Sequence, residues 1–449
     1  MRVIKIILAV VIILVIASIF FPKEEVKSMS NGDVIRISNN DTAGWSWHQR
    51  PLAVHYKGEK DKTYIGSITN TGDVQITSYN HETKELKKNT LFTIKEGEGG
   101  GDDHNSPAIL IRNSDKRIIV FWAGHFSTTC YYAISKEPED ISLFSEVREI
   151  ENPRGWYSYV QPIELTAENK IYLFTRRTYE KDPSVRVWDI NVSYDNGERF
   201  TREKPLWYES DTNAPYAEVY SNNVDTIYFL RSDWMKDKFS YVRKYLNFCY
   251  YKEGAFYKAD GSKIVDYKKL PISDRTKLDL IYDSDTEGDT GFVYSKDVGV
   301  DEEGNPVAVF TTMDEKNVNH YWYAKWNGTE WIKSYIVEAG YSIAEANTQP
   351  AYEAGIALNY DNVNQLYLSR EIPLGSGNFE IEKWASPDGG ETWNLDEEIT
   401  SGYKFLDDKQ FRPYVPINSH PELDVLWIGG PTYRTYNDFE TYLYGRFLE

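Results

Sequence analysis

Short apolar runs rich in aromatic and β-branched residues recur along the chain, and they limit its fold more than any other feature. They alternate with turns rich in Gly, Asn and Asp, and lie at Thr63–Ile68, Lys170–Phe174, Thr226–Leu230, Pro306–Phe310 and Gln365–Ser369. Runs of this kind are typical of β-strands. An interval of roughly 50 to 70 residues is expected when each run is the equivalent strand of successive four-stranded blades. The pattern therefore predicts an all-β protein, a β-propeller.

The length of the chain sets the expected number of blades. The chain has 449 residues, of which roughly 420 follow the N-terminal segment. Blades of about 60 residues would make seven, and six or eight blades stay open. No linker rich in Pro, Ser or Gly interrupts the sequence after residue 30. We therefore expect one β-propeller domain over residues 34–449, with seven blades of four-stranded antiparallel sheet, and a monomer.

The composition excludes one class of partner. The net charge is -19 and no run of Lys or Arg stands out, whereas a nucleic acid demands a basic surface. Aromatic residues make up 15% of the chain and include 35 tyrosines; aromatic faces suit both strand packing and stacking on sugar rings. We expect no nucleic-acid partner, and an anionic substrate would need a locally positive pocket.

The N-terminus has the pattern of an export signal. Arg2 and Lys5 precede an apolar run of 16 residues, Ile6–Phe21, and charged residues follow this run. This length is at the short edge for a membrane span, and the run has no clear small-x-small cleavage site. Residues 1–30 are expected to be either a cleaved signal peptide or an N-terminal membrane anchor. Both place the rest of the chain outside the cytoplasm, secreted or held on the outer face of the membrane.

Two of the seven histidines stand at the ends of an expected β-hairpin. His104 lies in Gly101–Pro107, and His125 follows the run Ile118–Trp122. Pairing of Ala108–Ile111 with that run would bring both histidines toward one end of the sheet. Because the pKa of imidazole is nearest neutrality, such a pair suits proton transfer or metal ligation. A purely structural, hydrogen-bonded role for each histidine stays open.

A repeated turn motif supports the blades. Ser386–Trp393 matches the Asp-box S-x-D-x-G-x-T-W, and Ser193–Phe200 is a degenerate copy. In such a hairpin turn the Asp accepts turn amide hydrogens, the Gly takes a positive φ and the aromatic residue packs beneath. Asp388 and Asp195 are therefore interpreted as structural and not catalytic.

Several segments together resemble a known family. They are Trp45–Pro51, Gly101–Pro107, Trp122–His125, Pro215–Val219, the Asp-box and Phe411–Pro413. With them the chain resembles the BNR-repeat propellers from about residue 34 to its C-terminus. Characterised members of that family include ulvan lyases and related rhamnose–glucuronate lyases. The resemblance implies a propeller fold and an exported polysaccharide lyase that cleaves an anionic, uronate-containing glycan by β-elimination.

β-Elimination at a uronic acid sets three chemical tasks. The C6 carboxylate must be neutralised, a base must remove the C5 proton, and an acid must protonate the departing C4 oxygen. Preorganised donors perform the first task, and the planar fork of Arg matches a carboxylate. The resemblance places this role on Arg176, at the end of a strand. Arg177 follows on the opposite strand face, and at least one of the two is expected to be a solvated rim residue.

The resemblance also implies the residues that move protons. His104 and His125 match the two histidines of the family. Tyr159 is the candidate for its first tyrosine, and Tyr216 matches the second. Tyr157 has the same strand parity as Tyr159 and could replace it. A tyrosine that acts as a base needs its pKa lowered by nearby Arg or His. We expect His104 or Tyr159 to carry the proton transfers, in an order that the sequence leaves open.

Metal binding is only weakly indicated. Asp102 and Asp103 beside His104 could hold a cation, or could instead cap a blade turn. The elimination itself is expected to need no cofactor. The resemblance allows a structural Zn²⁺ or Ca²⁺ ion, whose ligands the sequence does not place.

Two other functions remain open. The first is a propeller glycoside hydrolase, either an α-L-rhamnosidase or a sialidase. A sialidase would need an arginine cluster, for which Arg50, Arg176 and Arg412 are the candidates. The arginine-isoleucine-proline signature of sialidases is, however, absent from the sequence. The second is a glycan-binding propeller without catalysis. A binding protein is favoured if the five candidate residues do not meet in one pocket. The lyase is excluded if His104, His125 and Arg176 lie at opposite ends of the propeller.

Overall fold

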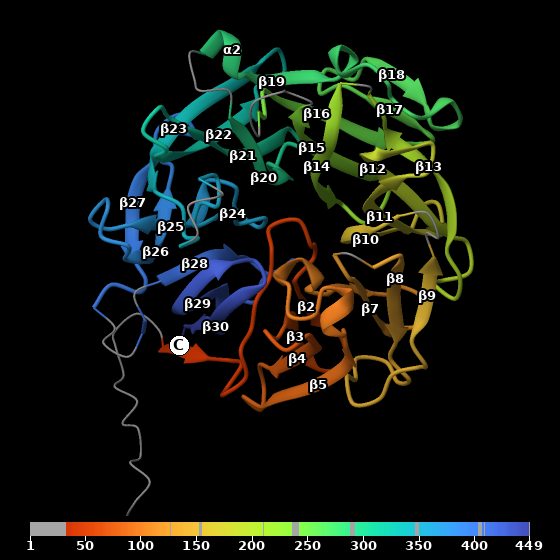
Figure 1. The fold of residues 1–449 in the computed structure, drawn as a ribbon, viewed down its shortest axis with the longest axis vertical. Coiled ribbons are helices and arrows are strands. Elements are labelled where there is room, and N and C mark those ends of the chain that lie inside the picture. The colour runs from red at the N-terminus through yellow and green to blue at the C-terminus, as the bar shows by residue number, and fades with distance from the viewer. Residues whose placement is uncertain are drawn as a thin grey trace, which may run out of the picture.

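The fold is a ring of β-sheets around a central axis (Figure 1). The computed structural model describes residues 33–448, except 126, 152–154, 210, 236–241, 288–291, 346–349, 403–405 and 408. Within this part of the chain, sheets that follow one another in sequence lie beside one another in space. The predicted all-β propeller is therefore confirmed.

The strands pair almost entirely with antiparallel neighbours. Four sheets have four strands each, with the bounds β2 (Ala53–Lys57), β3 (Asp61–Ile68), β4 (Asp73–Asn80), β5 (Leu86–Thr93); β6 (Ala108–Ile111), β7 (Ile118–Ala123), β8 (Thr129–Ile134), β9 (Arg148–Glu151); β10 (Tyr157–Leu165), β11 (Lys170–Tyr179), β12 (Asp182–Ser193), β13 (Thr201–Trp207); and β20 (Val293–Val300), β21 (Pro306–Met313), β22 (Asn319–Trp326), β23 (Trp331–Gly340). A fifth sheet has six strands, namely β14 (Thr212–Ser221), β15 (Thr226–Met235), β16 (Tyr245–Lys252), β17 (Ala255–Tyr257), β18 (Lys263–Asp266) and β19 (Asp279–Asp283). A sixth has eight strands, namely β24 (Ile356–Leu358), β25 (Gln365–Glu371), β26 (Phe379–Ala385), β27 (Asn394–Glu398), β28 (Lys409–Tyr414), β29 (Leu423–Thr435), β30 (Asp438–Phe447) and β1 (Asp33–Arg36).

The helices of the described residues are single turns. They are the 3₁₀ helices η1 (Glu96–Glu98), η2 (Asp103–Asn105), η3 (Tyr267–Lys269) and η4 (Arg275–Lys277), and the α-helix α2 (Ser284–Glu287). No helix of this part of the chain is long and apolar enough to cross a membrane. The expected export segment at residues 1–30 lies outside the described residues and stays a prediction, as does the monomer.

The recurrent apolar runs occupy equivalent strands. The five runs that define the sequence pattern lie in β3, β11, β15, β21 and β25. Each of these strands is hydrogen-bonded between the first strand of its unit and the third. Such a strand has a neighbour along both edges and a packed layer on both faces, so that a nearly continuous apolar sequence suits it. The prediction of equivalent strands is confirmed.

The division into sheets differs from the expected seven uniform units. The described strands form six hydrogen-bonded sheets. The largest sheet has two halves, one made of β24–β27 and the other of β28–β30 with β1. These halves are joined by a single parallel bridge, between Phe379 and Lys409. In the six-stranded sheet, β17 and β18 extend beyond β16, and β19 returns to pair with β16. The prediction of seven blades of four-stranded sheet is therefore wrong. Apolar periodicity locates strands, but it does not report hydrogen bonds between adjacent units.

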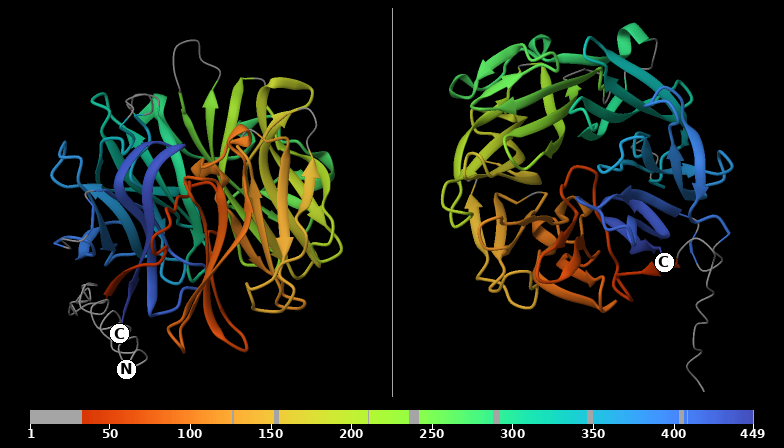
Figure 2. Two further views of the ribbon diagram at one scale, coloured as in Figure 1. Left: turned by 60° about the horizontal axis from the view of Figure 1, so that its bottom comes forward. Right: turned by 180° about the vertical axis from the view of Figure 1, so that it is seen from behind.

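The first and last strands close the ring. β1 pairs antiparallel with β30, in a register from Asp33 opposite Phe447 to Arg36 opposite Tyr444. The two views of Figure 2 show this red strand beside the blue C-terminal strands. Closure in this way leaves no long unpaired edge between the start and the end of the propeller.

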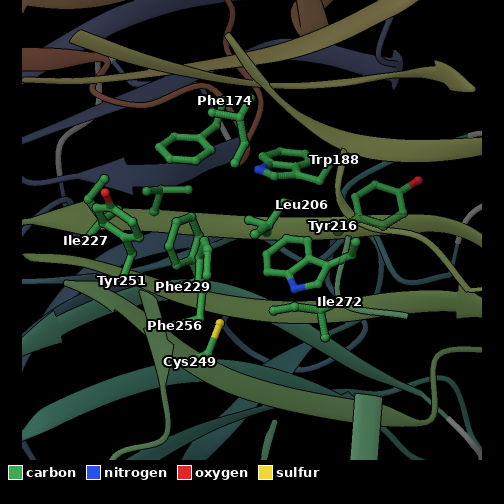
Figure 3. Packing of buried hydrophobic residues seen from close by; sticks show 14 of the residues in the cluster. Phe174, Trp188, Leu206, Tyr216, Ile227, Phe229, Cys249, Tyr251, Phe256 and Ile272 are labelled. Atoms are coloured by element: carbon green, nitrogen blue, oxygen red, sulfur yellow. The ribbon is translucent and has the colours of Figure 1, made fainter. Parts of the chain in front are cut away.

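The core fills the space between neighbouring sheets. In β11, Tyr172 and Phe174 pack into a cluster shared with β14–β17, whereas Ile171 and Leu173 pack into a cluster on the opposite face. Figure 3 shows the first cluster, with Trp188 beside aromatic rings of the next sheet. Fully burying one such side chain stabilises the fold by about 1.5–3 kcal/mol. Both cysteines of the chain are buried as free thiols.

The Asp residue of the repeated turn motif has the expected structural role. Asp388 Oδ1 accepts hydrogen bonds from the backbone N–H groups of Glu391 (3.1 Å) and Thr392 (2.8 Å). Asp195 Oδ1 accepts one from Arg199 N–H (2.9 Å) in the second copy. Trp393, the aromatic residue of the first motif, is buried in a cluster with Tyr323 and Trp384. These carboxylates hold hairpin turns and lie outside the pocket described below.

Candidate active site

A pocket of about 420 Å³ lies where the inner strands β10 and β14 begin. All five residues that the sequence predicts for the site line it: His104, His125, Tyr159, Arg176 and Tyr216. They come from η2, the loop after β7, and strands β10, β11 and β14. Neighbouring strands of a propeller end at the same side of the ring, which is why positions far apart in sequence meet here. The candidates therefore converge at one end of the propeller.

One carboxylate holds both histidines. Nδ1 of His104 lies 2.7 Å from Oδ1 of Asp102, and Nδ1 of His125 lies 2.9 Å from Oδ2 of the same residue. The two imidazole rings stack with their centroids 4.2 Å apart and an angle of 9° between their planes. Asp102 also accepts from the backbone N–H of His104 and so caps η2. Because each Nδ1 faces Asp102, each Nε2 is directed away from that carboxylate.

The two histidines differ in protonation. Burial and the neighbouring His104 lower the pKa of His125 to about 4. Burial opposes the charged form of His104 too, but Asp102 and Asp103 outweigh it and raise the pKa of His104 to about 9. At neutral pH, His104 is therefore a cation that can donate a proton, and His125 is neutral.

Asp102, His104 and His125 also place ligand atoms within 4.8 Å of one another. Imidazole nitrogens and carboxylate oxygens are ligands for metal ions, so the composition of this group would suit a metal ion. Both Nδ1 atoms, however, already hydrogen-bond to Asp102. The observed geometry is that of a carboxylate that orients two imidazoles.

Asp103 is fixed by residues from the last sheet. Its Oδ2 accepts hydrogen bonds from Nη1 of Arg412 (2.5 Å) and from the hydroxyl of Tyr433 (2.6 Å). Its Oδ1 lies 3.0 Å from Nδ1 of His104. Arg412 therefore positions a carboxylate behind His104.

The arginine cluster considered for a sialidase does not form. Arg412 pairs with Asp103, and Arg50 pairs with Glu218 (2.7 Å) and Asp297 (3.0 Å) inside the ring. Of the three arginines, Arg176 alone lines the pocket. The internal carboxylates that pair with the other two could not be foreseen from local sequence.

A β-bulge separates Tyr159 from Tyr157. The register of β10 against β11 shifts between Ser158 and Val160, and Tyr159 has a φ of 60°. Its ring lies in the pocket, with its centroid 5.5 Å from that of His104, whereas Tyr157 is fully buried in the core. The expectation that Tyr157 could replace Tyr159 is wrong, because parity holds only along a regular strand. A left-handed conformation at a bulky residue is strained, and such strain concentrates at functional sites.

The adjacent arginines of β11 take opposite faces. Arg176 lines the pocket, and its Nε donates a hydrogen bond to Oγ of Ser158 (3.0 Å). Arg177 points the other way and forms an ion pair with Asp189. The predicted alternation is confirmed. The expectation of a solvated rim residue is wrong for both, because Arg176 is 6% exposed and Arg177 is 1% exposed.

Tyr216 lies between two guanidinium groups. The guanidinium carbons of Arg176 and Arg243 are 4.6 Å and 4.1 Å from the centroid of its ring. Burial alone would raise the pKa of this phenol, but the two cations lower the pKa of Tyr216 to about 7. At Tyr159, burial dominates and raises the pKa well above its usual value. Of these two tyrosines, Tyr216 is the one that ionises near neutral pH.

Arg243 is a site residue that the sequence analysis missed. It lies outside the strands, so no periodicity marks it. It is 7% exposed, and its Nε and Nη1 atoms have no hydrogen-bond partner among the described residues. Buried donors of a cation are costly to leave without an acceptor. The pocket therefore presents two buried guanidinium groups, those of Arg176 and Arg243, to an anionic ligand.

His48 supports the two tyrosines from beneath. Its Nδ1 lies 2.6 Å from Oε1 of Glu218, and its Nε2 lies 2.8 Å from the hydroxyl oxygen of Tyr294. Its ring centroid is 4.8 Å from that of Tyr159 and 5.0 Å from that of Tyr216. Burial lowers the pKa of His48 well below its usual value, which keeps this ring neutral. The only sequence signal for His48 was its place in the segment Trp45–Pro51.

The outer lining of the pocket is aromatic and basic. It includes Trp156, Arg186, Trp234 and Tyr436. Indole and phenol rings offer apolar faces to sugar rings together with polar edges. The pocket as a whole therefore suits an anionic carbohydrate.

Comparison with known proteins places the chain in a family. Residues 62–339 match the family described as BNR repeat-containing. The chain belongs to this family. A curated relative is an ulvan lyase of Nonlabens ulvanivorans, which is 26% identical over 390 residues that cover 77% of this chain and 76% of the relative.

Solved structures share the fold. An ulvan lyase from a polysaccharide lyase family, bound to -[GlcA(1-4)Rha3S]-, aligns with a TM-score of 0.69 at 18% identity, over 91% of this chain and 94% of that chain. A hypothetical selenium-binding protein of Sulfolobus tokodaii aligns with a TM-score of 0.50 at 12% identity, over 87% of this chain and 92% of that chain. At these identities the likeness shows the propeller architecture of this BNR-repeat chain and not its activity.

Proposed function

We propose that this protein is an exported polysaccharide lyase that cleaves a uronate-containing glycan, of the ulvan or rhamnose–glucuronate type, by β-elimination. The observation that carries the proposal is the convergence of His104, Tyr159, Arg176 and Tyr216 in one pocket. The curated relative, itself an ulvan lyase, supports it. Glycosidases commonly act through a pair of carboxylates, whereas the groups that line this pocket are imidazole, phenol and guanidinium.

The two arginines bind the uronate carboxylate. Loss of the C5 proton places negative charge on C5 and the C6 carboxylate, and fixed donors stabilise that charge without reorganisation. Arg176 is held by Ser158 and by the rings of Tyr159 and Tyr216. Arg243 adds donors that have no partner among the described residues. The pocket thus supplies the cationic environment that an elimination at a uronate needs.

The protonation states assign the base and the acid. Tyr216, with its pKa near neutrality, accepts the C5 proton on its phenolate oxygen. The electron pair of that C–H bond forms the C4–C5 double bond as the C4–O bond breaks. His104, protonated at neutral pH, donates a proton to the departing oxygen. Tyr159 lies between them, with its centroid 5.5 Å from that of His104 and 5.9 Å from that of Tyr216.

The remaining members of the site position these groups. Asp102 orients both imidazoles through Nδ1 and stabilises the cation on His104. His125 stacks on His104 and limits its movement. In this proposal, side chains of the protein perform every step of the elimination.

A polysaccharide assay tests the reaction. We expect the protein to release products with the ultraviolet absorbance of an unsaturated uronate from ulvan or rhamnose–glucuronate side chains. In water enriched in heavy oxygen, the products should carry no label at the cleaved bond, because elimination consumes no water. Label at a new reducing end without absorbance would establish a hydrolase. Saturable retention on the glycan without any cleavage would establish a binding protein.

The pH profile tests the proton assignments. We expect kcat/KM to rise as pH passes about 7, where Tyr216 loses its proton, and to fall as pH passes about 9, where His104 loses its own. In Arg243→Gln the rising limb should move to higher pH, because one of the two cations that lower the pKa of Tyr216 is gone. Arg202→Gln, on β13, is the matched control and should leave both limbs in place. An unmoved rising limb in Arg243→Gln would show that this limb does not report Tyr216.

A further inference from the structure

A second pocket, also of about 420 Å³, opens at the other end of the ring. It is lined by the last residues of β10 and β14, whereas the active-site pocket lies where these two strands begin. Gln161 and Glu218, midway along the strands, are fully buried between the pockets. Among the described residues the two pockets share no lining side chain, so each can hold a ligand of its own.

The walls of the second pocket are mostly apolar and aromatic. They include proline, valine and isoleucine side chains and the phenol rings of Tyr56, Tyr220 and Tyr360. The rings of Tyr220 and Tyr360 stack with their centroids 5.0 Å apart and an angle of 7° between their planes. A pocket of this volume, with apolar walls and a few polar groups, is typical of a binding site for a small molecule or a sugar residue.

The guanidinium and ammonium groups of this lining are already paired. Their partners are Glu218 and Asp297 for Arg50, Asp115 and Glu198 for Arg112, and the carbonyl oxygen of Asn113 for Lys116. The second pocket thus differs from the active-site pocket, where Arg243 has buried donors without an acceptor among the described residues. An anionic ligand would find little to bind it here.

Glu164 brings a carboxylate to the second pocket, and one of its oxygens is left for a ligand. The residue is 9% exposed, and its Oε2 accepts a hydrogen bond from the backbone N–H of Asn113 (2.7 Å). Within the described part of the chain, Oε1 has no hydrogen-bond partner, and neither have the hydroxyls of Tyr56 and Tyr220. Burial raises the pKa of Glu164, so a donor at Oε1 would stabilise the charged carboxylate.

We propose that the second pocket binds a neutral sugar residue of a polysaccharide, whose hydroxyl groups donate to Oε1 of Glu164 and bond to the phenols of Tyr56 and Tyr220. Sugar hydroxyls are donors, and a carboxylate oxygen is a strong acceptor. Apolar and aromatic walls suit the C–H face of a pyranose ring. A 6-deoxy sugar such as rhamnose fits best, because its methyl group is apolar. An acidic sugar is disfavoured, because Glu164 would repel it.

The two ends of the ring would then select for opposite chemistry. The active-site pocket offers free guanidinium groups to an acidic sugar, and the second pocket offers a free acceptor to a neutral one. A polymer that is held at the second pocket has its other residues at a raised local concentration near the protein. This binding goes beyond the proposed elimination and can be measured without any cleavage.

Titrations with two monosaccharides test the proposal. Methyl α-L-rhamnoside and methyl α-D-glucuronide are each added to the full chain, and binding is followed by saturation-transfer NMR. We expect saturable binding of the rhamnoside, with the same Kd in wild type and in Arg176→Ala, because Arg176 lies in the other pocket. The glucuronide should bind more weakly to Arg176→Ala than to wild type.

Glu164→Gln identifies the acceptor. Its amide oxygen can keep the hydrogen bond from Asn113, but an NH₂ group replaces the free acceptor. We expect the Kd for the rhamnoside to rise at least about tenfold, the contribution of a hydrogen bond to a charged group. Glu149→Gln, which changes an exposed carboxylate of β9, is the matched control and should bind the rhamnoside as wild type does.

Several results would overturn the proposal. The second pocket is not a site for neutral sugars if the rhamnoside does not bind, or if Glu164→Gln binds it with the Kd of wild type. Rhamnoside binding that is lost in Arg176→Ala and kept in Glu164→Gln would place the neutral sugar in the active-site pocket. Should Glu164→Gln not fold, Tyr220→Phe removes one hydroxyl of the same site and must weaken binding, whereas Tyr250→Phe, outside both pockets, must not.

Discussion

Arg176→Ala is expected to lower kcat/KM on a uronate polymer by at least about 100-fold, the typical effect of removing one preorganised donor from a developing anion. The loss has two physical causes. The uronate carboxylate loses its planar cationic partner, and Tyr216 loses one of the two cations that lower its pKa. Steady-state rates of absorbance increase measure the effect.

The variants that accompany Arg176→Ala separate these causes. Arg176→Lys keeps a positive charge but not the fork that fits a carboxylate, so it should restore part of the activity and most of the pH profile. Arg202→Ala is the control for loss of a surface arginine, and circular dichroism checks that each variant is folded. Wild-type rates in Arg176→Ala would remove this residue from the reaction.

Tyr216→Phe is expected to lower kcat by about 10²–10⁴-fold, the contribution of a positioned proton-transfer group, while KM changes little. The phenol is flanked by Arg176 and Arg243, so its removal takes away the base and leaves the cationic environment of the carboxylate in place. The measurement is a comparison of kcat and KM with wild type.

Two other tyrosines provide controls for Tyr216→Phe. Tyr157→Phe should retain wild-type rates, because the hydroxyl of Tyr157 is in the core and has no hydrogen-bond partner among the described residues. Tyr159→Phe tests the assignment directly. If it loses more activity than Tyr216→Phe, Tyr159 is the base and our assignment is wrong.

Most of the architecture and the candidate residues could be foreseen from the sequence. Apolar runs such as Lys170–Phe174 mark strands because a strand packed on both faces must be apolar along its length. The segments around His104 and Tyr216 were recognised by resemblance, and the structure brings them into one pocket.

The remainder depends on contacts between distant residues. The bulge that turns Tyr159 into the pocket and leaves Tyr157 in the core breaks the alternation on which strand parity rests. The pairing of Arg412 with Asp103 joins residues 309 positions apart. Arg243 lies outside any strand, so only the folded chain shows that it faces Tyr216. Local pattern cannot report such contacts, because they depend on how the ring closes.

The pairing of β1 with β30 determines when the ring can be completed. Of the described strands, the ribosome makes β1 first and β30 last, and no other described strand pairs with β1. Each middle sheet can form from a local stretch of chain, but the closing ladder has to wait until β30 has been made. Closure of the ring therefore comes after synthesis of all the other described strands, and removal of either β1 or β30 would interrupt the same ladder.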